Sequence, residues 1–512
     1  MPSRNLPSRP HLDHLRHEAK ALHKAFHDGE ADARHRVRAA LGDTPALKLT
    51  DAQRVIAREY GFPTWARLRA RVEGLRGLEE AVGEFLGAVQ SQDAQGALRA
   101  LSMEPRIAVE SLHVAAVLGL ADNVRRLIAK DPSAVTLRAG DPPADSLLYL
   151  CYSLYHGESA ERDTGLLGTA RLLLDAGADP NTRDGRYGVP ALYAVTGVRS
   201  VLPIARLLLD HGANPTDGES VFHAAERFHE DALELLLSAG ADLNATGEWG
   251  NTPLYFLLRW HDVEREPHVG QGLRWLLRHG ADPNVPCGRE RENALHVAAR
   301  WGQRPSVIRL LLDHGADVRA RTGDGRSAWF LARRGGFDEV AALLESAGAQ
   351  PEALSPTDNL LAACGRGDSK AARLLTSPDL LRALETGDLL LLPEAAVSDR
   401  APTVLACLAA GFPVDTRDAQ GATALHHAAI HGNAPLVRAL LAAGADFSIR
   451  DTEHRSTVMG WACFGADHVS DAEGDHAECV RALLDAGARP HPDEHPPRHP
   501  RVRAVLAPFS TR

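Results

Sequence analysis

Near its C-terminal end, the sequence carries two cysteines and two histidines, side chains that commonly bind zinc. They are Cys463, His468, His476 and Cys479. Their spacing puts them far apart along two predicted helices and a loop, whereas structural zinc sites use close pairs of ligands. The acidic residues of the same stretch, 467–475, lack the fixed loop spacing and the glycine of an EF-hand. We therefore expect no metal ion here.

A second group of candidate ligands is the six histidines between residues 11 and 35. On a helix they would spread around most of the circumference, because successive residues are about 100° apart. Only His23 and His27 have the i,i+4 spacing that lets two side chains hold one ion. We expect these histidines to face solvent.

The motifs of common enzyme classes are missing from the sequence. It contains no GxSxG, GxxxxGK[ST] or HExxH motif and no kinase-type set. A site in the irregular segment 351–403 would have Cys364 and several carboxylates, but the next histidine is His426. We predict that the protein is not an enzyme and uses no cofactor.

Length and composition favour an array or several domains over one globular core, since the chain has 512 residues. The six cysteines show no CxxC spacing, which favours a reducing compartment. The first ten residues have no apolar core of a signal peptide, and no apolar run approaches the length of a membrane span. We expect a cytoplasmic protein that does not contact membranes.

One stretch, residues 418–446, shows how the rest of the chain is organised. Thr423 is a candidate N-cap, and the helix after it is interrupted by Gly432. Gly444 is placed to end a second, longer helix in a left-handed conformation. A turn, a short helix and a longer helix in about 33 residues match the period of ankyrin repeats.

The stretch resembles an ankyrin repeat, with the letters TALH at 423–426 where that family usually has TPLH. Similar units recur over roughly residues 107–490, and the pattern is weak between 351 and 403. The resemblance implies an all-α ankyrin-repeat solenoid of about ten or eleven helix-turn-helix repeats with short hairpin turns. We predict an N-terminal helical module (1–76), an array with degenerate first repeats (77–350), diverged repeats or a hinge (351–403), C-terminal repeats (404–490) and a Pro/His-rich tail (491–512).

A histidine recurs at the last position of the TPLH-like motif and could be mistaken for a catalytic series. The resemblance implies that it is structural, bonding near the start of its own repeat and across to a neighbour. These residues are His113, His223, His296 and His426.

The N-terminal segment is the most basic part of a chain whose formal net charge is −10. Residues 1–76 contain 15 Lys and Arg against 9 Asp and Glu. Residues 51–60 and 64–73 indicate a helix pair, separated by residues 61–63. We interpret this segment as a module that covers the end of the array, and it resembles the leader of many bacterial ankyrin arrays. The alternative is a helix-turn-helix that reads DNA, with the array as partner sensor.

Two adjacent positions at the end of the first helix of each repeat are candidates for a binding role beyond the structural pattern of the repeat. The resemblance implies that they face outward on the concave surface, where ankyrin proteins contact their targets. Arg and Trp are also the side chains most enriched at binding hot spots. Packing between neighbouring repeats is the competing interpretation.

We predict a concave site of Arg227, Phe228, Arg259, Trp260, Arg300, Trp301, Ile430, His431 and Phe464. We place all the aromatic members and His431 at one shared position. The hairpin edge of the same surface would contain Trp249, Asn251, Arg326, Gln420, Glu453 and Arg455.

From these observations we expect a monomeric, non-catalytic scaffold that binds a protein partner. The sequence does not identify that partner, because ankyrin surfaces share a scaffold and differ in what they bind. Nucleic acid enters only through the alternative interpretation of residues 51–73.

Overall fold

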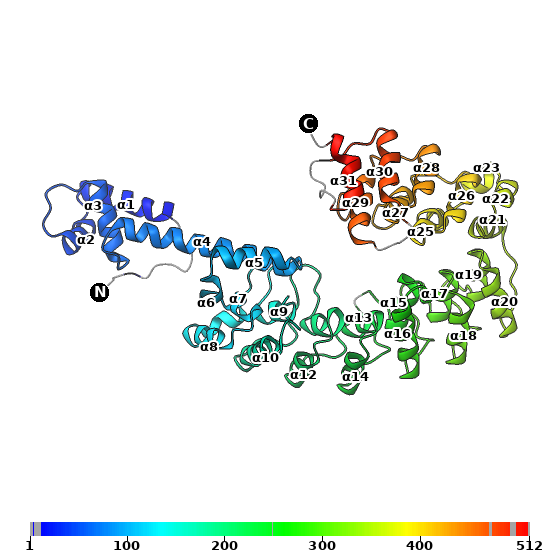
Figure 1. Ribbon diagram of the computed structural model, residues 1–512, viewed down its shortest axis with the longest axis horizontal. Coiled ribbons are helices and arrows are strands. Elements are labelled where there is room, and N and C mark those ends of the chain that lie inside the picture. Colours follow the sequence, from blue (N-terminus) through cyan, green and yellow to red (C-terminus); the bar gives the residue numbers. More distant parts are fainter. Residues whose placement is uncertain (1–3, 5–11, 248, 470–473, 492–497, 510–512) are drawn as a thin grey trace. The chain divides into compact units, whose positions relative to one another are not determined.

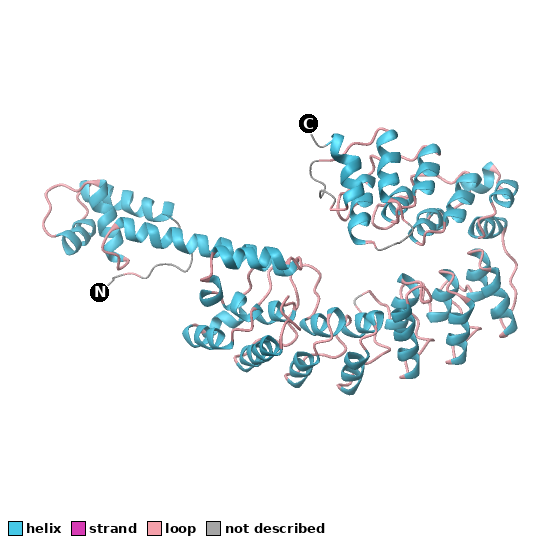
Figure 2. Cartoon of the chain, in the orientation of Figure 1, coloured by secondary structure: helices cyan, strands magenta, loops and turns pink. Residues whose placement is uncertain are grey.

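The computed structural model describes residue 4 and residues 12–247, 249–469, 474–491 and 498–509. Within these residues the chain forms helices, loops and isolated β-bridges but no β-strand (Figure 2). The fold is therefore all-α, as predicted. Packing divides the chain into two compact units. Unit 1 is Met1–Ala224 with His229–Asp242, and unit 2 is Ala225–Phe228 with Leu243–Arg512.

Unit 1 begins with a small helical module that has its own apolar core, which includes Leu15, Ile56 and Leu68. The predicted break at residues 61–63 is present, and Phe62 closes the preceding helix by donating its N–H to the carbonyl of Ala57 at 2.8 Å. The helices of the module are α1 (Leu12–His27), α2 (Ala31–Leu41), α3 (Leu49–Glu59) and α4 (Trp65–Gln90).

The helix α4 continues past residue 76 and packs on the first helices of the array. Its buried side chains there include Phe85, Leu86 and Val89. The other helices of unit 1 are α5 (Ala94–Met103), α6 (Ile107–Glu110), α7 (Leu112–Val117), α8 (Ala121–Lys130), η1 (Pro132–Thr136), α9 (Ser146–Cys151), α10 (Ala160–Asp175), α11 (Ala191–Tyr193), η2 (Ala194–Val198), α12 (Leu202–Asp210) and α14 (Glu230–Ser238). The helix α13 (Ser220–Arg227) contains the boundary between the units.

The repeat formed by α27 (Ala424–Ile430) and α28 (Ala434–Ala442) shows why the pattern folds in this way. Thr423 is the N-cap of α27, and its N–H donates to Nδ1 of His426 at 3.1 Å. Gly432 reverses the chain with a φ of 68°, and Gly444 ends α28 with a φ of 90°. Residues that carry a side chain rarely adopt these backbone angles, so glycine is required at both turns. The predicted cap and both predicted glycine positions are confirmed.

Unit 2 continues this arrangement of helix pairs. Its first part contains α15 (Pro253–Trp260), α16 (Pro267–Arg278), α17 (Ala294–Arg300), α18 (Pro305–Asp313), α19 (Ala328–Arg334) and α20 (Asp338–Ser346). The diverged segment contains α21 (Pro356–Gly365), α22 (Ser369–Leu375), α23 (Pro378–Arg382), α24 (Thr386–Leu389), α25 (Leu391–Val397) and α26 (Ala401–Ala410), which begins before residue 403. The last helices are α29 (Val458–His468), α30 (His476–Asp485), α31 (Pro500–Leu506) and η3 (Ala507–Phe509).

The diverged segment stays within the stack, because α21 packs on α19 and α25 packs on α27 (Figure 1). Arg400 fastens this junction. Its guanidinium donates to the carbonyl of Gly365 at 2.7 Å and lies 4.5 Å from the ring centroid of Phe337. One hydrophobic core extends from Leu360 on α21 to Leu506 on α31. None of the described helices is long and apolar enough to cross a membrane.

Candidate functional site

Arginines recur at one position of successive repeats in unit 2. Arg259, Arg300 and Arg334 each come seven residues after the N-cap of their helix, which is Thr252, Asn293 and Ser327 respectively. Arg227 ends α13 at the equivalent place. We call this set the arginine stripe: Arg227, Arg259, Arg300 and Arg334.

The aromatic side chains follow the stripe by one residue, as predicted for Phe228, Trp260 and Trp301. His431 also comes eight residues after its N-cap, Thr423. The prediction that Phe464 shares this position is wrong, because Phe464 comes only seven residues after the N-cap Thr457. Phe464 therefore corresponds to Ile430 and the arginines.

Arg259 lies between two tryptophan rings. Its guanidinium carbon is 4.9 Å from the ring centroids of both Trp260 and Trp301, and Trp301 belongs to the next repeat. Trp260 is 55% exposed, whereas Trp301 is half-buried with its indole nitrogen out of solvent. Cation–π contact fixes the arginine without removing it from the surface. Trp260 is the accessible aromatic, and Trp301 also packs between repeats.

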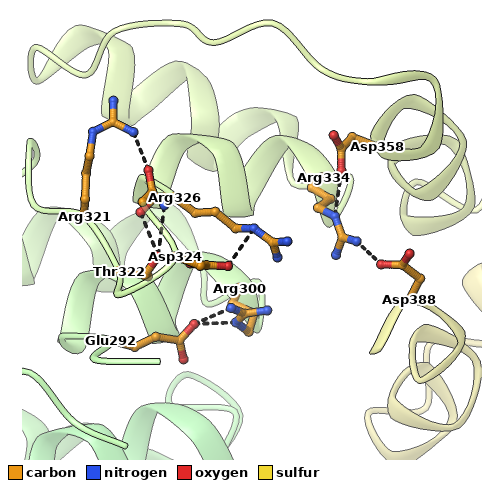
Figure 3. A network of polar contacts seen from close by, with 10 residues as sticks. Glu292, Arg300, Arg321, Thr322, Asp324, Arg326, Arg334, Asp358 and Asp388 are labelled. Atoms are coloured by element: carbon orange, nitrogen blue, oxygen red, sulfur yellow. Dashed lines mark hydrogen bonds and ion pairs between the residues drawn. The ribbon is translucent and has the colours of Figure 1, made fainter. Parts of the chain in front are cut away.

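Arg300 forms an ion pair with a buried carboxylate. Its guanidinium contacts Oε1 of Glu292 at 2.5 Å and 2.6 Å, and only 5% of the Glu292 side chain is exposed (Figure 3). The hydroxyl of Tyr255 donates to the other carboxylate oxygen at 3.3 Å. Burial, followed by the charge of Glu292, raises the pKa of Tyr255 to about 12. The network joins α15 to α17.

Arg334 is a member of the stripe that the sequence analysis missed. It donates to Asp358 at 2.8 Å and to Asp388, which lie on α21 and α24 (Figure 3). Gly335 follows it in place of an aromatic residue, so the Arg–aromatic pattern does not mark it. Its distance from the N-cap Ser327 was the signal that could have revealed it.

The C-terminal candidates are held by contacts of their own. His476 donates to the carbonyl of Ile430 at 2.9 Å, and His431 donates to the carbonyl of Val397 at 2.8 Å. The ring of Phe464 is more than half exposed and stacks on His468, with 4.2 Å between the centroids. Ile430 ends α27, His431 follows it and Phe464 lies on α29, far in sequence from Trp260 and Trp301.

The predicted hairpin edge consists of turn residues with differing exposure. Trp249 is 82% exposed, and Gln420, Glu453 and Arg455 are exposed as well. Backbone hydrogen bonds fix two of the turns, because Asn251 accepts from the N–H of Gly247 at 3.0 Å and Gln420 accepts from that of Thr452 at 2.8 Å. Arg326 is half-buried and pairs with Asp324 at 2.9 Å.

The zinc-type side chains take part in packing. Cys463 and Cys479 are buried, and His468 and His476 make the contacts given above. Across the described residues, no three histidine, cysteine or acidic side chains are arranged to hold a metal. His11 from the N-terminal group, together with Asp471 and Glu473, lies outside those residues.

The helix pair considered for DNA binding is formed by α3 and the start of α4. Arg58 donates to the carbonyl of Ala40, and Arg69 pairs with Glu73 at 2.8 Å. These contacts use part of the basic charge within the module. DNA binding stays a prediction.

The family model described as ankyrin repeats (3 copies) matches residues 263–355 and 360–494. A second model, ankyrin repeats (many copies), matches residues 221–265. Together the matches span more than half of the chain. The chain belongs to the ankyrin-repeat family.

Relatives of this ankyrin-repeat chain include human ankyrin repeat and SOCS box protein 11, 31% identical over 31% of this chain and 46% of that protein. The nuclear factor NF-kappa-B p105 subunit of Gallus gallus is 28% identical over 24% of this chain and 15% of that protein. The chain thus spans less than half the length of these relatives. They come from animals, and a bacterial origin, which the resemblance of the N-terminal segment to the leader of bacterial arrays implies, stays an expectation.

Two solved structures align with almost their whole length. The human ASB11 ankyrin repeat domain is 25% identical with a TM-score of 0.35, and the alignment covers 47% of this chain and 99% of that domain's chain. The ankyrin repeat domain of Bcl-3 is 23% identical with a TM-score of 0.25, and covers 52% and 99%.

The recurring histidine of the ankyrin motif is structural where its contacts are described. His296 accepts from the N–H of Asn293 at 3.3 Å and donates to the carbonyl of Ala320 at 3.0 Å. His113 donates to the carbonyl of Leu137 at 3.0 Å. Burial lowers the pKa of both, and lowers that of His426 to about 4. The lowered pKa favours the neutral ring, in which one nitrogen donates and the other accepts, as in His296.

A different histidine links three successive ankyrin repeats at the edge of the stripe. His261 lies between Glu226 at 3.2 Å and Glu266 at 3.0 Å, and its carbonyl accepts from Gln303 at 2.6 Å. Burial opposes its charge, but the two carboxylates outweigh burial and hold the pKa of His261 above its usual value.

We expect His261 to make unit 2 less stable as the pH rises. Because its folded-state pKa is raised, the stabilisation is complete below about pH 6.5, the unfolded value, and is lost as pH rises through the folded value. Melting curves of wild type and His261→Gln between pH 6 and pH 9 would converge at the alkaline end. A constant difference across this range would contradict the charge of His261 as the cause.

Proposed function

We propose that this ankyrin-repeat protein is a non-catalytic scaffold that binds a protein partner through Trp260 and the arginine stripe. Family membership supports protein binding in general. The position of the surface rests on one observation, the exposed ring of Trp260 beside an arginine fixed between two tryptophans.

Such an arrangement suits a binding hot spot for two reasons. Tryptophan and arginine supply large contact area together with directed donors. Arg259 is already ordered by the two rings, so little conformational entropy is lost when a partner binds. The neighbouring network of Arg300, Glu292 and Tyr255 holds the two repeats in register.

The proposal is tested by recovering partners from the native host with the full chain as bait. Trp260→Ala is expected to weaken partner binding tenfold or more, as hot-spot truncations do. Trp260 is preferred to Trp301 for this test, because Trp301 is half-buried and its removal would also disturb packing.

A second variant, Trp249→Ala, removes an even more exposed tryptophan from the predicted hairpin edge and so tests the two parts of the predicted surface separately. Circular dichroism and melting temperature show whether each variant is folded. Full partner recovery by folded Trp260→Ala would refute the proposed surface. Loss of the partner only in Trp249→Ala would place binding on the hairpin edge.

A further inference from the structure

The arginine stripe of unit 2 is met by carboxylates from a later part of the chain. Arg334 contacts Asp358 and Asp388, both of which belong to the diverged segment. The side chains of Arg334, Asp358 and Asp388 are 17%, 14% and 11% exposed, so the pairs are largely shielded from water. Charge-assisted contacts with a guanidinium are strong and directional in such a setting.

A third carboxylate, Glu394 on α25, faces the same charges. It is half-buried, and burial raises its pKa. The charges acting on it include Arg259, Arg300 and Arg334, which oppose this rise, and Asp418, which adds to it. Three members of the stripe therefore act on one acidic side chain more than fifty residues downstream of Arg334.

We propose that the arginine stripe binds an acidic segment of the partner protein, and that in the free protein Asp388 occupies the Arg334 end of the stripe while Glu394 adds negative charge nearby. This inference rests on the proposed function and adds the chemistry of the partner. The fitting ligand is a chain segment with carboxylates for the guanidinium groups and an apolar side chain for the ring of Trp260. Such a segment must displace the internal carboxylates, which lowers its apparent affinity.

A nucleic acid would also present negative groups to arginine and tryptophan. One observation favours the acidic protein segment: the groups that this chain itself places against the stripe are carboxylates, Asp358 and Asp388 on Arg334.

The test is fluorescence anisotropy with a labelled peptide of Glu, Asp and Leu residues and the full chain. The paired variant Asp388→Asn/Glu394→Gln is expected to bind this peptide about tenfold more tightly than wild type, because its internal competitors are neutral. Adding Arg259→Gln is expected to remove the gain. The matched control is Arg309→Gln, which changes an exposed arginine on α18 and is expected to leave affinity unchanged.

Three outcomes would overturn the inference. One is equal affinity of wild type and the paired variant for the acidic peptide. If the paired variant has a lower melting temperature than wild type, Glu394→Gln alone takes its place in this comparison. Another is tight binding of a peptide in which Gln and Asn replace Glu and Asp. The third is binding of a labelled single-stranded oligonucleotide where the acidic peptide does not bind.

The two proposals fail in distinguishable ways. Partner recovery that depends on Trp260, without any peptide binding, retains the surface and rejects the acidic ligand. Peptide binding that depends on Arg259, with partner recovery independent of Trp260, retains the stripe as an acid-binding surface and rejects it as the main partner site.

Discussion

Gly365→Ala is expected to destabilise unit 2 by about 1–3 kcal/mol, the usual cost of forcing extra volume into a packed interior. A Cβ at residue 365 would overlap the carbonyl of Gly335 and lie 3.0 Å from the backbone nitrogen of Gly336. Backbone atoms at the end of α19 cannot rotate away as a side chain can. Relief therefore requires α21 to move from α19, which also disturbs the contact of Arg400 with the carbonyl of Gly365.

The measurement is thermal and urea unfolding of the full chain, with hydrogen exchange to locate the change at α19–α21. Gly387→Ala on α24 is the matched control, because a Cβ there meets nothing within 4 Å. It is expected to be neutral or slightly stabilising, since alanine is the better helix former. Equal stability of the two variants would show that the junction tolerates separation.

Arg300→Ala is expected to cost about 2–3 kcal/mol, because it leaves the carboxylate of Glu292 buried without its cation. An exposed ion pair would contribute far less. Glu292 then keeps the hydrogen bond from Tyr255 on α15 but loses its cation. Unfolding of the full chain by urea gives the difference in stability.

The paired variant Arg300→Ala/Glu292→Gln is expected to recover part of this loss, since it removes the charge that was left unpaired. Arg309→Ala is the matched control for the loss of an arginine side chain. A loss no larger for Arg300→Ala than for Arg309→Ala would mean that Glu292 finds water or another partner.

Local features of the fold could be predicted from sequence because each is decided by a few neighbouring residues. The N-cap Thr423 and the turns at Gly432 and Gly444 are of this kind. The position of Phe464 was predicted one residue too far along, because Ala466 stands in its repeat where other repeats have the reversing glycine. Without that glycine, α29 continues to His468 and the register must be counted from the N-cap.

The parts of the site that sequence reasoning missed depend on contacts between distant segments. Arg334 lacks the aromatic neighbour that marked Arg259 and Arg300. Asp388 and Glu394 lie where the repeat pattern is weak, and their approach to the stripe is set by how the diverged helices stack. No local pattern encodes that approach.

The sandwich of Arg259 between Trp260 and Trp301 also gives the stripe an optical reporter. Indole emission depends on what touches the face of the ring, and one face of each of these two rings is covered by the guanidinium. A carboxylate that binds Arg259 in place would change the charge against both rings at once. Binding of a ligand to the stripe is therefore expected to change the intrinsic tryptophan fluorescence of the protein, with no label attached.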